Sequence, residues 1–182
     1  MGSATMEYGV PYRIYKPGKD GNGSASQVET RREPTKWGYD VNTFWSVVKQ
    51  DGVDKNGNAK FKWKDEEKSK VNIKLSMSDI SKILLVLRGQ SKEVKLFHVP
   101  GGKATPTNEG DSTVITFTRR DDGGGYSLQA SSKRSSNVVR ISQGVADDEA
   151  LLLENWFTRV VTSSWDRPPR DAVLSEGDEQ MF

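Results

Sequence analysis

Lysines alternate with aromatic residues in the short stretch AKFKWK. A strand would place Lys60, Lys62 and Lys64 on one face and Phe61 and Trp63 on the other. A row of lysines can follow a chain of phosphates, and rings can stack on unpaired bases at roughly 1 to 3 kcal/mol each. The alternative is that both rings belong to the core and the lysines form a solvated face. For Phe61 we favour the core, because a neighbouring helix needs an apolar surface to cover.

Other aromatic residues precede this stretch. Trp37, Tyr39 and Trp45 would line up only on an unbroken strand, and Gly38 interrupts the run. Each of these rings is therefore either a platform for a base or a structural ring. On a neighbouring strand, Lys74 can join the row of lysines.

Basic side chains elsewhere offer further contacts to phosphates. Four of them flank a predicted hairpin in the second half of the chain, and two lysines near the front can form a basic arm. Together with the tyrosine that opens the strand after the hairpin turn, these candidates are Lys16, Lys19, Arg119, Arg120, Tyr126, Lys133 and Arg134. Charges at hairpin ends are commonly only solvated, so none of these residues carries the prediction alone.

Residues suited to catalysis or metal binding are sparse. His98 is the only histidine and the chain has no cysteine, which excludes a histidine-rich cage and a thiolate site. Asp121 and Asp122 precede three glycines, as a hairpin turn requires, and no helix follows to make a phosphate-binding loop. No nucleophile stands with a base. We therefore expect no enzyme, no metal and no cofactor.

A strand joined directly to a helix must position the lysines. Val71, Ile73 and Leu75 alternate with polar residues, which is typical of a strand with one buried face. Ser78 is the expected N-cap of the helix, and Gly89 is its expected stop. The apolar residues at helical spacing are Ile80, Ile83, Leu84 and Leu87.

The same plan recurs between Val138 and Trp165. Apolar residues alternate up to Ser142, where the strand is expected to end, and the acidic residues 147–149 open a helix. The apolar residues of this helix are Leu153, Trp156, Phe157 and Val160. The other predicted strands span residues 12–15, 41–48, 59–64, 92–99, 113–118 and 126–131, with 59–64 paired to 71–75 across a turn at 65–69. Each half is therefore predicted to contain about four strands and one helix.

The order of these motifs resembles the Whirly family of single-stranded DNA-binding proteins. Ile73 to Pro100 is similar to that family's central segment, in which a strand ending in Leu-Ser leads into a Thr/Ser-capped helix. In the family, the next strand ends in Phe-Phe-His-Asp-Pro, and here the motif is Phe97-His98-Val99-Pro100, without the aspartate. The resemblance covers roughly residues 12–165.

This resemblance implies an α+β fold of two antiparallel four-stranded sheets with two helices, arranged as pseudo-duplicated ββββα units. It implies a homotetramer with central helices and sequence-tolerant binding of single-stranded DNA. We then expect the lysine row to contact nucleic acid. Because Leu85 and Val86 make the first helix more apolar than one stripe requires, we expect a second buried face against another subunit. Coactivators of the positive-cofactor-four type and kinetoplastid guide-RNA-binding proteins share this plan, so RNA is an alternative ligand.

The chain of 182 residues has a formal charge of +2, and this charge is unevenly distributed. Residues 166–182 carry −3, so residues 1–165 carry +5. We expect a disordered start or cloning scar at 1–11, one domain at 12–165, and an acidic disordered tail at 166–182. The sequence has no membrane-length apolar run and no signal-like start. The expected location is therefore the cytoplasm, an organelle or the nucleus, and not the secreted fraction.

The chain ends in EGDEQMF, which resembles the C-terminal tips of bacterial and phage single-stranded DNA-binding proteins that recruit replication or repair partners. Asp178, Glu179 and Phe182 are its candidate partner-binding residues, and a merely solubilising end is the alternative. We predict a sequence-tolerant single-stranded DNA-binding protein of replication, recombination, repair or transcription. An RNA-binding or annealing protein of the same fold and a protein-interaction module are the alternatives.

Overall fold

The computed structural model describes residues 7–8, 10–35, 38–64, 69–99, 111–134 and 137–165. Trp37 and the acidic tail, with Asp178, Glu179 and Phe182, lie outside the described residues, as does the side chain of Tyr39. The expectations for these residues stay predictions.

The first antiparallel sheet contains β1 (Glu7–Tyr8), β2 (Tyr12–Lys16), β3 (Ser24–Thr35), β4 (Gly38–Val53), β5 (Ala59–Phe61) and β6 (Lys70–Leu75). Four of these strands pair in the order β2–β3–β4–β6. The short strands β1 and β5 extend the sheet, β1 along the outer half of β3 and β5 along the far end of β4. β-Branched and aromatic residues in β4 favour this extended backbone.

The second antiparallel sheet contains β7 (Glu93–His98), β8 (Ser112–Arg119), β9 (Tyr126–Arg134) and β10 (Asn137–Val145), paired in the order β10–β9–β8–β7. One helix follows each sheet, α1 (Met77–Leu87) after β6 and α2 (Asp147–Trp165) after β10. The expected α+β plan of two sheets and two helices is confirmed, with β1 and β5 as additions to it.

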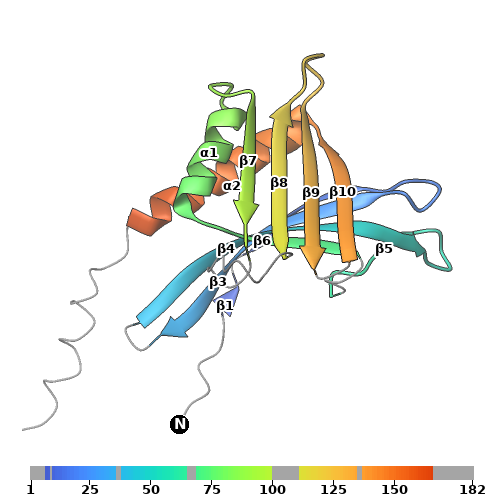
Figure 1. Ribbon diagram of the computed structural model, residues 1–182, viewed down its shortest axis with the longest axis horizontal. Coiled ribbons are helices and arrows are strands. Elements are labelled where there is room, and N and C mark those ends of the chain that lie inside the picture. The colour runs from blue at the N-terminus through green and yellow to red at the C-terminus, as the bar shows by residue number, and fades with distance from the viewer. Residues whose placement is uncertain are drawn as a thin grey trace, which may run out of the picture.

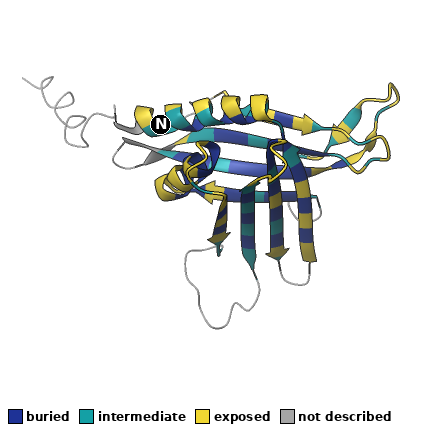
Figure 2. Cartoon of the chain, turned by 90° about the horizontal axis from the view of Figure 1, so that it is seen from above, coloured by how far each residue is buried: buried dark blue, intermediate teal, exposed yellow. Residues whose placement is uncertain are grey.

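The two sheets cross at a steep angle, and the two helices lie together beside them (Figure 1). Figure 2 shows the strands of the second sheet standing away from the long first sheet. Along most strands in that view, buried and less buried residues alternate, so each sheet has one face toward the core and one face turned outward.

Three large rings join both sheets to the second helix in the core. Trp45 of β4 lies 5.7 Å from Phe117 of β8 and 5.8 Å from Phe157 of α2, measured between ring centroids. All three side chains are almost fully buried. Aromatic rings bury much apolar area and prefer such tilted contacts, so this cluster holds the two sheets in fixed relative positions.

The strand that carries the alternating lysines differs from the prediction. β5 ends at Phe61, so it is shorter than residues 59–64. It pairs with β4 at Gln50 and Val53, and the expected hairpin with residues 71–75 is wrong. The reason is the length of β4, since β6 pairs with its residues 43–48 and β5 occupies the same edge farther along.

The boundaries of several elements also differ. Ser76, and not Ser78, caps α1, because its hydroxyl accepts from the backbone of Asp79 while that carboxylate accepts from the backbone of Ser76. Gly89 stops the helix as expected, with a φ of +71° that favours glycine. β10 continues beyond Ser142 to Val145. The strand from residue 24 to 35 was not predicted, because its run of charged residues hides the alternation.

Candidate nucleic-acid interface

The first sheet turns a polar and aromatic face away from the core. Cross-strand register and alternation place the same side of β2, β3, β4 and β6 on this surface. We call it the first outer face, and its residues are Arg13, Tyr15, Gln27, Glu29, Arg31, Phe44, Ser46, Phe61, Lys70, Asn72 and Lys74.

Rings on the first outer face are partly open to solvent. Tyr15 is 47% exposed, and its ring lies 5.6 Å from that of Phe61. Phe61 is half-buried and does not belong to the core cluster, contrary to the expectation. Farther along the sheet, the guanidinium of Arg31 stands 4.6 Å from the centroid of Phe44. Such a cation over a ring face is attracted by the ring quadrupole.

Most polar groups of the first outer face bind one another. Arg13 Nε donates to Gln27 Oε1 at 2.6 Å, Gln27 donates in turn to Glu29, and Arg31 pairs with Glu29. On the next strands the hydroxyl of Ser46 donates to Asn72 Oδ1 at 2.8 Å. Lys74 is exposed and makes no ion pair with the described residues. The surface is cationic, but its side chains are already largely satisfied.

The outward face of the second sheet has fewer hydrogen bonds and ion pairs among its own side chains. Register places four residues in one row across the sheet, Phe97, Val114, Ser131 and Arg140, and four in the next row, Lys95, Thr116, Gln129 and Ser142. We call this surface the second outer face, and it comprises these eight residues with Glu93, Ser112, Thr118, Ser127, Lys133, Val138 and Gly144.

Charge and exposure distinguish the second outer face. Phe97 is 62% exposed, which is unusual for a phenylalanine in a strand. Lys95, Lys133 and Arg140 are exposed and have no ion pair among the described residues. Glu93 is the face's single carboxylate, and it accepts from the hydroxyl of Thr118 at 2.9 Å. The surface thus combines one open ring with three cations that are free to meet an anion.

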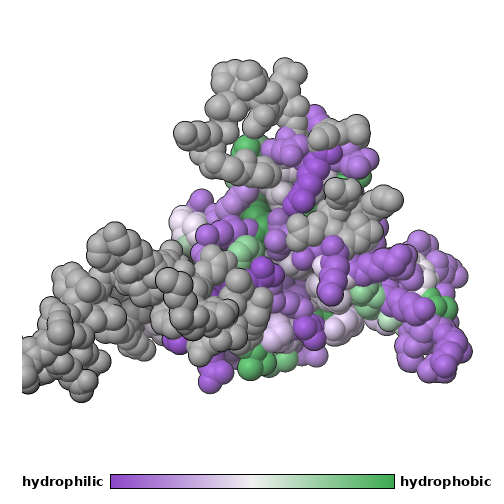
Figure 3. Space-filling model, turned by 90° about the horizontal axis from the view of Figure 1, so that it is seen from below, coloured by the Kyte–Doolittle hydropathy of each residue, from purple (hydrophilic) through white to green (hydrophobic). Residues whose placement is uncertain are grey.

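Hydrophilic residues dominate the part of the described surface that Figure 3 shows from below. The hydrophobic residues visible there form small, separate patches. Stacking on this protein would therefore depend on individual rings, and not on one continuous apolar surface.

Two predicted contact residues are buried, so the structure contradicts their assignment. Trp45 is 1% exposed and belongs to the core cluster. Tyr126 is 6% exposed, stacks on Phe117 with centroids 5.1 Å apart, and donates its hydroxyl to the carbonyl of Leu87 at 3.1 Å. Neither ring can meet a base in this conformation, because neighbouring residues already cover it.

The predicted row of Lys60, Lys62 and Lys64 does not form, because β5 ends before the second lysine. Lys62 pairs with Asp51, with 2.8 Å between Nζ and Oδ2. Trp63 and Lys64 lie in the following turn, Trp63 half-buried and Lys64 exposed. Lys60 is exposed on β5 itself.

The expected basic arm is also divided. Lys16 Nζ lies 2.7 Å from Glu149 Oε1 and ties the end of β2 to the first turn of α2. Lys19 is exposed in the loop that follows. Gln50 holds this loop, since its Oε1 accepts from the backbone of Gly18 at 2.8 Å and of Gly23 at 3.1 Å.

The cations around the hairpin of β8 and β9 lie over different parts of the surface. Arg120 reaches the second outer face, because a Cβ on Gly144 would lie 2.7 Å from its Nη2. Arg119 lies instead over Gly89, where a Cβ would be 2.9 Å from Nη1. Lys133 stands on the second outer face, and Arg134 has the opposite parity, so it does not.

Sequence reasoning missed several residues of the two faces, namely Arg13, Tyr15, Phe44, Lys95, Phe97, Gln129 and Arg140. For Lys95, Phe97 and Arg140, the signal was present in the alternation of β7 and β10. Val94 and Leu96 point inward, which sends Lys95 and Phe97 outward, and the neighbours of Arg140 are likewise buried.

His98 has a structural contact, as the sequence suggested. Its Nε2 lies 3.1 Å from Asp79 Oδ2 and so joins the end of β7 to the start of α1. Burial acts to raise the pKa of Asp79, but hydrogen bonds from Ser76 and the contact with His98 outweigh it and hold that pKa below its ordinary value. Among the described residues, no three His, Cys, Asp or Glu side chains gather as metal ligands would.

Neither helix in the described part of the chain has the length and apolarity needed to cross a membrane. No protein-family model and no curated protein matches the sequence.

Solved structures share the fold. The plant transcriptional regulator PBF-2 aligns with a TM-score of 0.63 at 22% identity, over 94% of this chain and 90% of that chain. WHY1 from Arabidopsis thaliana gives 0.61 at 20% identity, over 85% and 88%. Both are Whirly proteins. A guideRNA-binding protein complex bound to a gRNA gives 0.59 at 15% identity, over 85% and 90%. The resemblance to the Whirly family is thus confirmed at the level of the fold.

Proposed function

We propose that this protein binds single-stranded nucleic acid through its two outer faces, with little dependence on sequence. Its ligand is single-stranded DNA that arises in replication, recombination, repair or transcription. The observation that carries the proposal is the row structure of the second outer face. This face carries an exposed ring, Phe97, and three cations that form no ion pair with another described residue, Lys95, Lys133 and Arg140.

Physical chemistry connects this surface to a single strand. Unpaired bases have free faces that can stack on Phe97, whereas the bases of a duplex are already stacked. Lysine and arginine displace counterions from phosphates, which favours any polynucleotide. The first outer face adds Tyr15, Phe44 and Lys74 on a surface that points in another direction. Binding rather than catalysis is the proposed role.

The comparisons support this proposal through what the similar proteins do. One is a transcriptional regulator from a plant, and another is a guideRNA-binding protein complex with its gRNA bound. Because the fold is shared over most of each chain, a surface of the same sheets is available here.

A titration of the full chain with a labelled single strand and the matching duplex tests the proposal. We expect tighter binding of the single strand. Each phosphate contact should contribute about −0.7 to the slope of log K against log salt, so three cations give a slope near −2. Lys95→Ala and Lys133→Ala should each remove about 0.7 of that slope. Equal affinity for both forms, or no binding, would refute the proposal.

RNA is the second candidate ligand, and the observation in its favour is the likeness to a complex with a bound gRNA. Competition between DNA and RNA oligonucleotides of one sequence separates the candidates. DNA that displaces RNA at lower concentration supports the first proposal, and the opposite order favours RNA.

Assembly into a homotetramer through the helices is part of the proposal. Met77 and Leu85 of α1 are 41% and 44% exposed, and Leu151 and Leu152 of α2 are 60% and 54% exposed. Val86, which the sequence analysis also assigned to a subunit contact, is fully buried in its own core. These exposed apolar side chains are the surface on which other subunits would pack.

The acidic tail completes the proposal. Its carboxylates compete with the bound strand for the cationic body, and its terminal Phe182 docks on a replication or repair protein. The protein then acts where such strands occur, in the cytoplasm or in an organelle or nucleus.

A further inference from the structure

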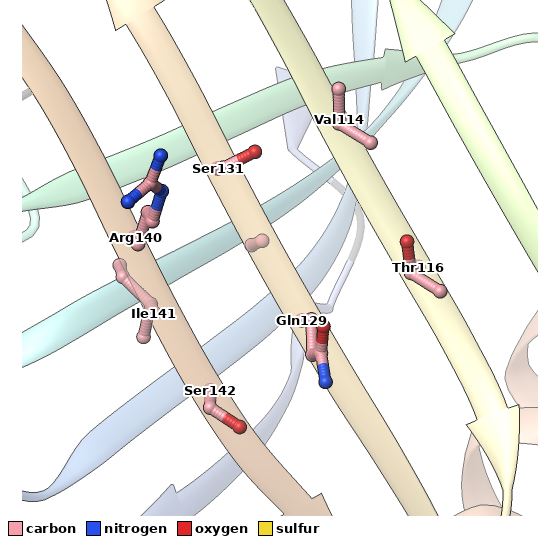
Figure 4. Close-up of a pocket in the computed structure, with 8 residues that line it drawn as sticks. Val114, Thr116, Gln129, Ser131, Arg140, Ile141 and Ser142 are labelled. Carbon is pink, nitrogen blue, oxygen red and sulfur yellow. The ribbon is translucent and has the colours of Figure 1, made fainter.

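The second outer face is hollowed where β8, β9 and β10 run side by side. A shallow cavity of about 340 Å³ lies there, over the middle of the sheet (Figure 4). The side chains that line it come from two adjacent rows, Thr116, Gln129 and Ser142 in one, Val114, Ser131 and Arg140 in the other. Ala130 and Ile141, which face the core, form its floor.

Two polar side chains of this cavity have no partner among the described residues. Gln129 and Arg140 are exposed, and neither side chain forms a hydrogen bond or ion pair with another described residue. Figure 4 shows the two side chains on neighbouring strands, β9 and β10, over the same hollow. On the first outer face, by contrast, comparable side chains bind one another. This cavity therefore presents an amide and a guanidinium that no other described residue binds.

The chemistry of these two groups fits one nucleotide. A guanidinium binds phosphate oxygens in a fork and keeps its charge at any physiological pH. An amide offers a donor and an acceptor side by side, which matches the N6 donor and N7 acceptor on the Hoogsteen edge of adenine, a pair that no other base carries on that edge. The rows are about 7 Å apart, since successive residues on one face are two strand positions apart. A base can therefore lie on Gln129 while its phosphate meets Arg140.

We propose that this cavity receives one adenine of the bound strand, with the amide of Gln129 on its base edge and Arg140 on its phosphate. The inference rests on the proposed function and adds a base preference to binding that is otherwise sequence-tolerant. The hydroxyls of Thr116, Ser131 and Ser142 surround the base, and Phe97 at the end of the Arg140 row stacks the next one.

Competition among adenine, cytosine and thymine homopolymers of equal length tests the inference with the full chain. We expect the adenine homopolymer to bind about 5- to 150-fold more tightly than the thymine homopolymer. Gln129→Ala and the shape-retaining Gln129→Leu should remove this preference while leaving the affinity for thymine unchanged. Gln90→Ala, which truncates an exposed glutamine outside the face, is the matched control and should keep the ranking.

The outcomes separate the two proposals. If no homopolymer binds, the proposed function fails and the inference fails with it. If all bind but adenine does not lead, or if Gln129→Ala and Gln129→Leu leave the ranking unchanged, only the base-reading cavity is overturned. Thermal unfolding of both variants should match the wild type, because Gln129 is exposed and has no partner among the described residues.

Discussion

At the scale of single residues, the ring of Phe97 can be removed with little effect on the fold, because 62% of the residue is exposed. Phe97→Ala should lower the affinity for a single strand about 5- to 150-fold, the loss expected for one stacking platform. Fluorescence anisotropy measures the affinity, and thermal unfolding should be unchanged. Val53→Ala, which truncates another exposed apolar residue outside the second outer face, should bind normally. Normal binding by Phe97→Ala would show that bases do not stack there.

Residue type alone could not separate core rings from exposed ones. Trp45 was a candidate platform and Phe61 a favoured core residue, and the structure reverses both. Alternation predicts that Trp45 and its neighbours face opposite ways, but not which side is covered. That depends on Val28 and Ile73, which stand opposite Trp45 in register, and on Phe117 from the other sheet. Such partners lie too far along the chain to be read from local spacing.

At the scale of elements, the start of α1 depends on one carboxylate. Asp79 Oδ2 accepts from the hydroxyl and backbone of Ser76 at 2.7 and 2.8 Å and lies 3.1 Å from His98 Nε2. Because the pKa of Asp79 is lowered by folding, this contribution is present above its ordinary value of 3.8. It is lost as the pH falls through the folded-state pKa.

Asp79→Asn should therefore cost about 1 kcal/mol of unfolding free energy at neutral pH, the usual worth of a cap. The difference from wild type should shrink below pH 3.8, where the wild-type carboxylate also becomes protonated. Urea unfolding at several pH values measures it. Asp20→Asn, at an exposed loop position, is the control and should show no difference. A difference between Asp79→Asn and wild type that stays constant with pH would contradict the role of the charge.

The exposed side of α1 is the surface through which we propose that the subunits assemble. Leu85→Asp should reduce the oligomer to smaller species, because a buried carboxylate between subunits is costly. The fold should survive, since Leu85 is 44% exposed in its own protomer. Light scattering measures the mass, and circular dichroism checks the fold. Val53→Asp places the same charge on an exposed apolar position away from the helices and should leave the mass unchanged. An intact Leu85→Asp oligomer would remove this surface from the assembly.

Elements were predictable to the extent that their signals are local. The helix from Met77 to Leu87 followed from apolar spacing and a glycine stop, and only its cap was misplaced by two residues. The pairing of β5 with the end of β4 is also local, a hairpin whose turn is closed where the backbone N–H of Gly57 donates to the carbonyl of Asp54. It was missed because the turn residues before Asn56 hid the continuation of β4 through Gly52 to Val53. The lysine row failed for a different reason, because it required β5 to continue to Lys64, whereas β5 ends at Phe61.

At the scale of the whole molecule, the plan of two sheets and two helices could be predicted, because the strand-to-helix pattern occurs twice. The outer faces could not, because each combines strands that are distant in the chain. Arg140, Ser131, Val114 and Phe97 form one row only after four strands have paired. The order of the motifs along the chain thus predicted the architecture. The candidate contact surface could be identified only from the pairing register of the strands.

The distribution of charge yields the last prediction. Residues 1–165 carry +5 and residues 166–182 carry −3. The acidic tail and a nucleic acid would therefore both be attracted to the same cationic surface. Deleting Gly177 to Phe182 removes two carboxylate side chains and Phe182, and should tighten binding of a single strand at low salt. The gain should disappear at high salt, where screening over a few ångströms weakens both attractions. Asp178→Asn with Glu179→Gln retains the length and Phe182, and it should reproduce the gain without losing capture of a replication or repair partner. A deletion that changes neither binding nor partner capture would leave the tail as a solubilising end.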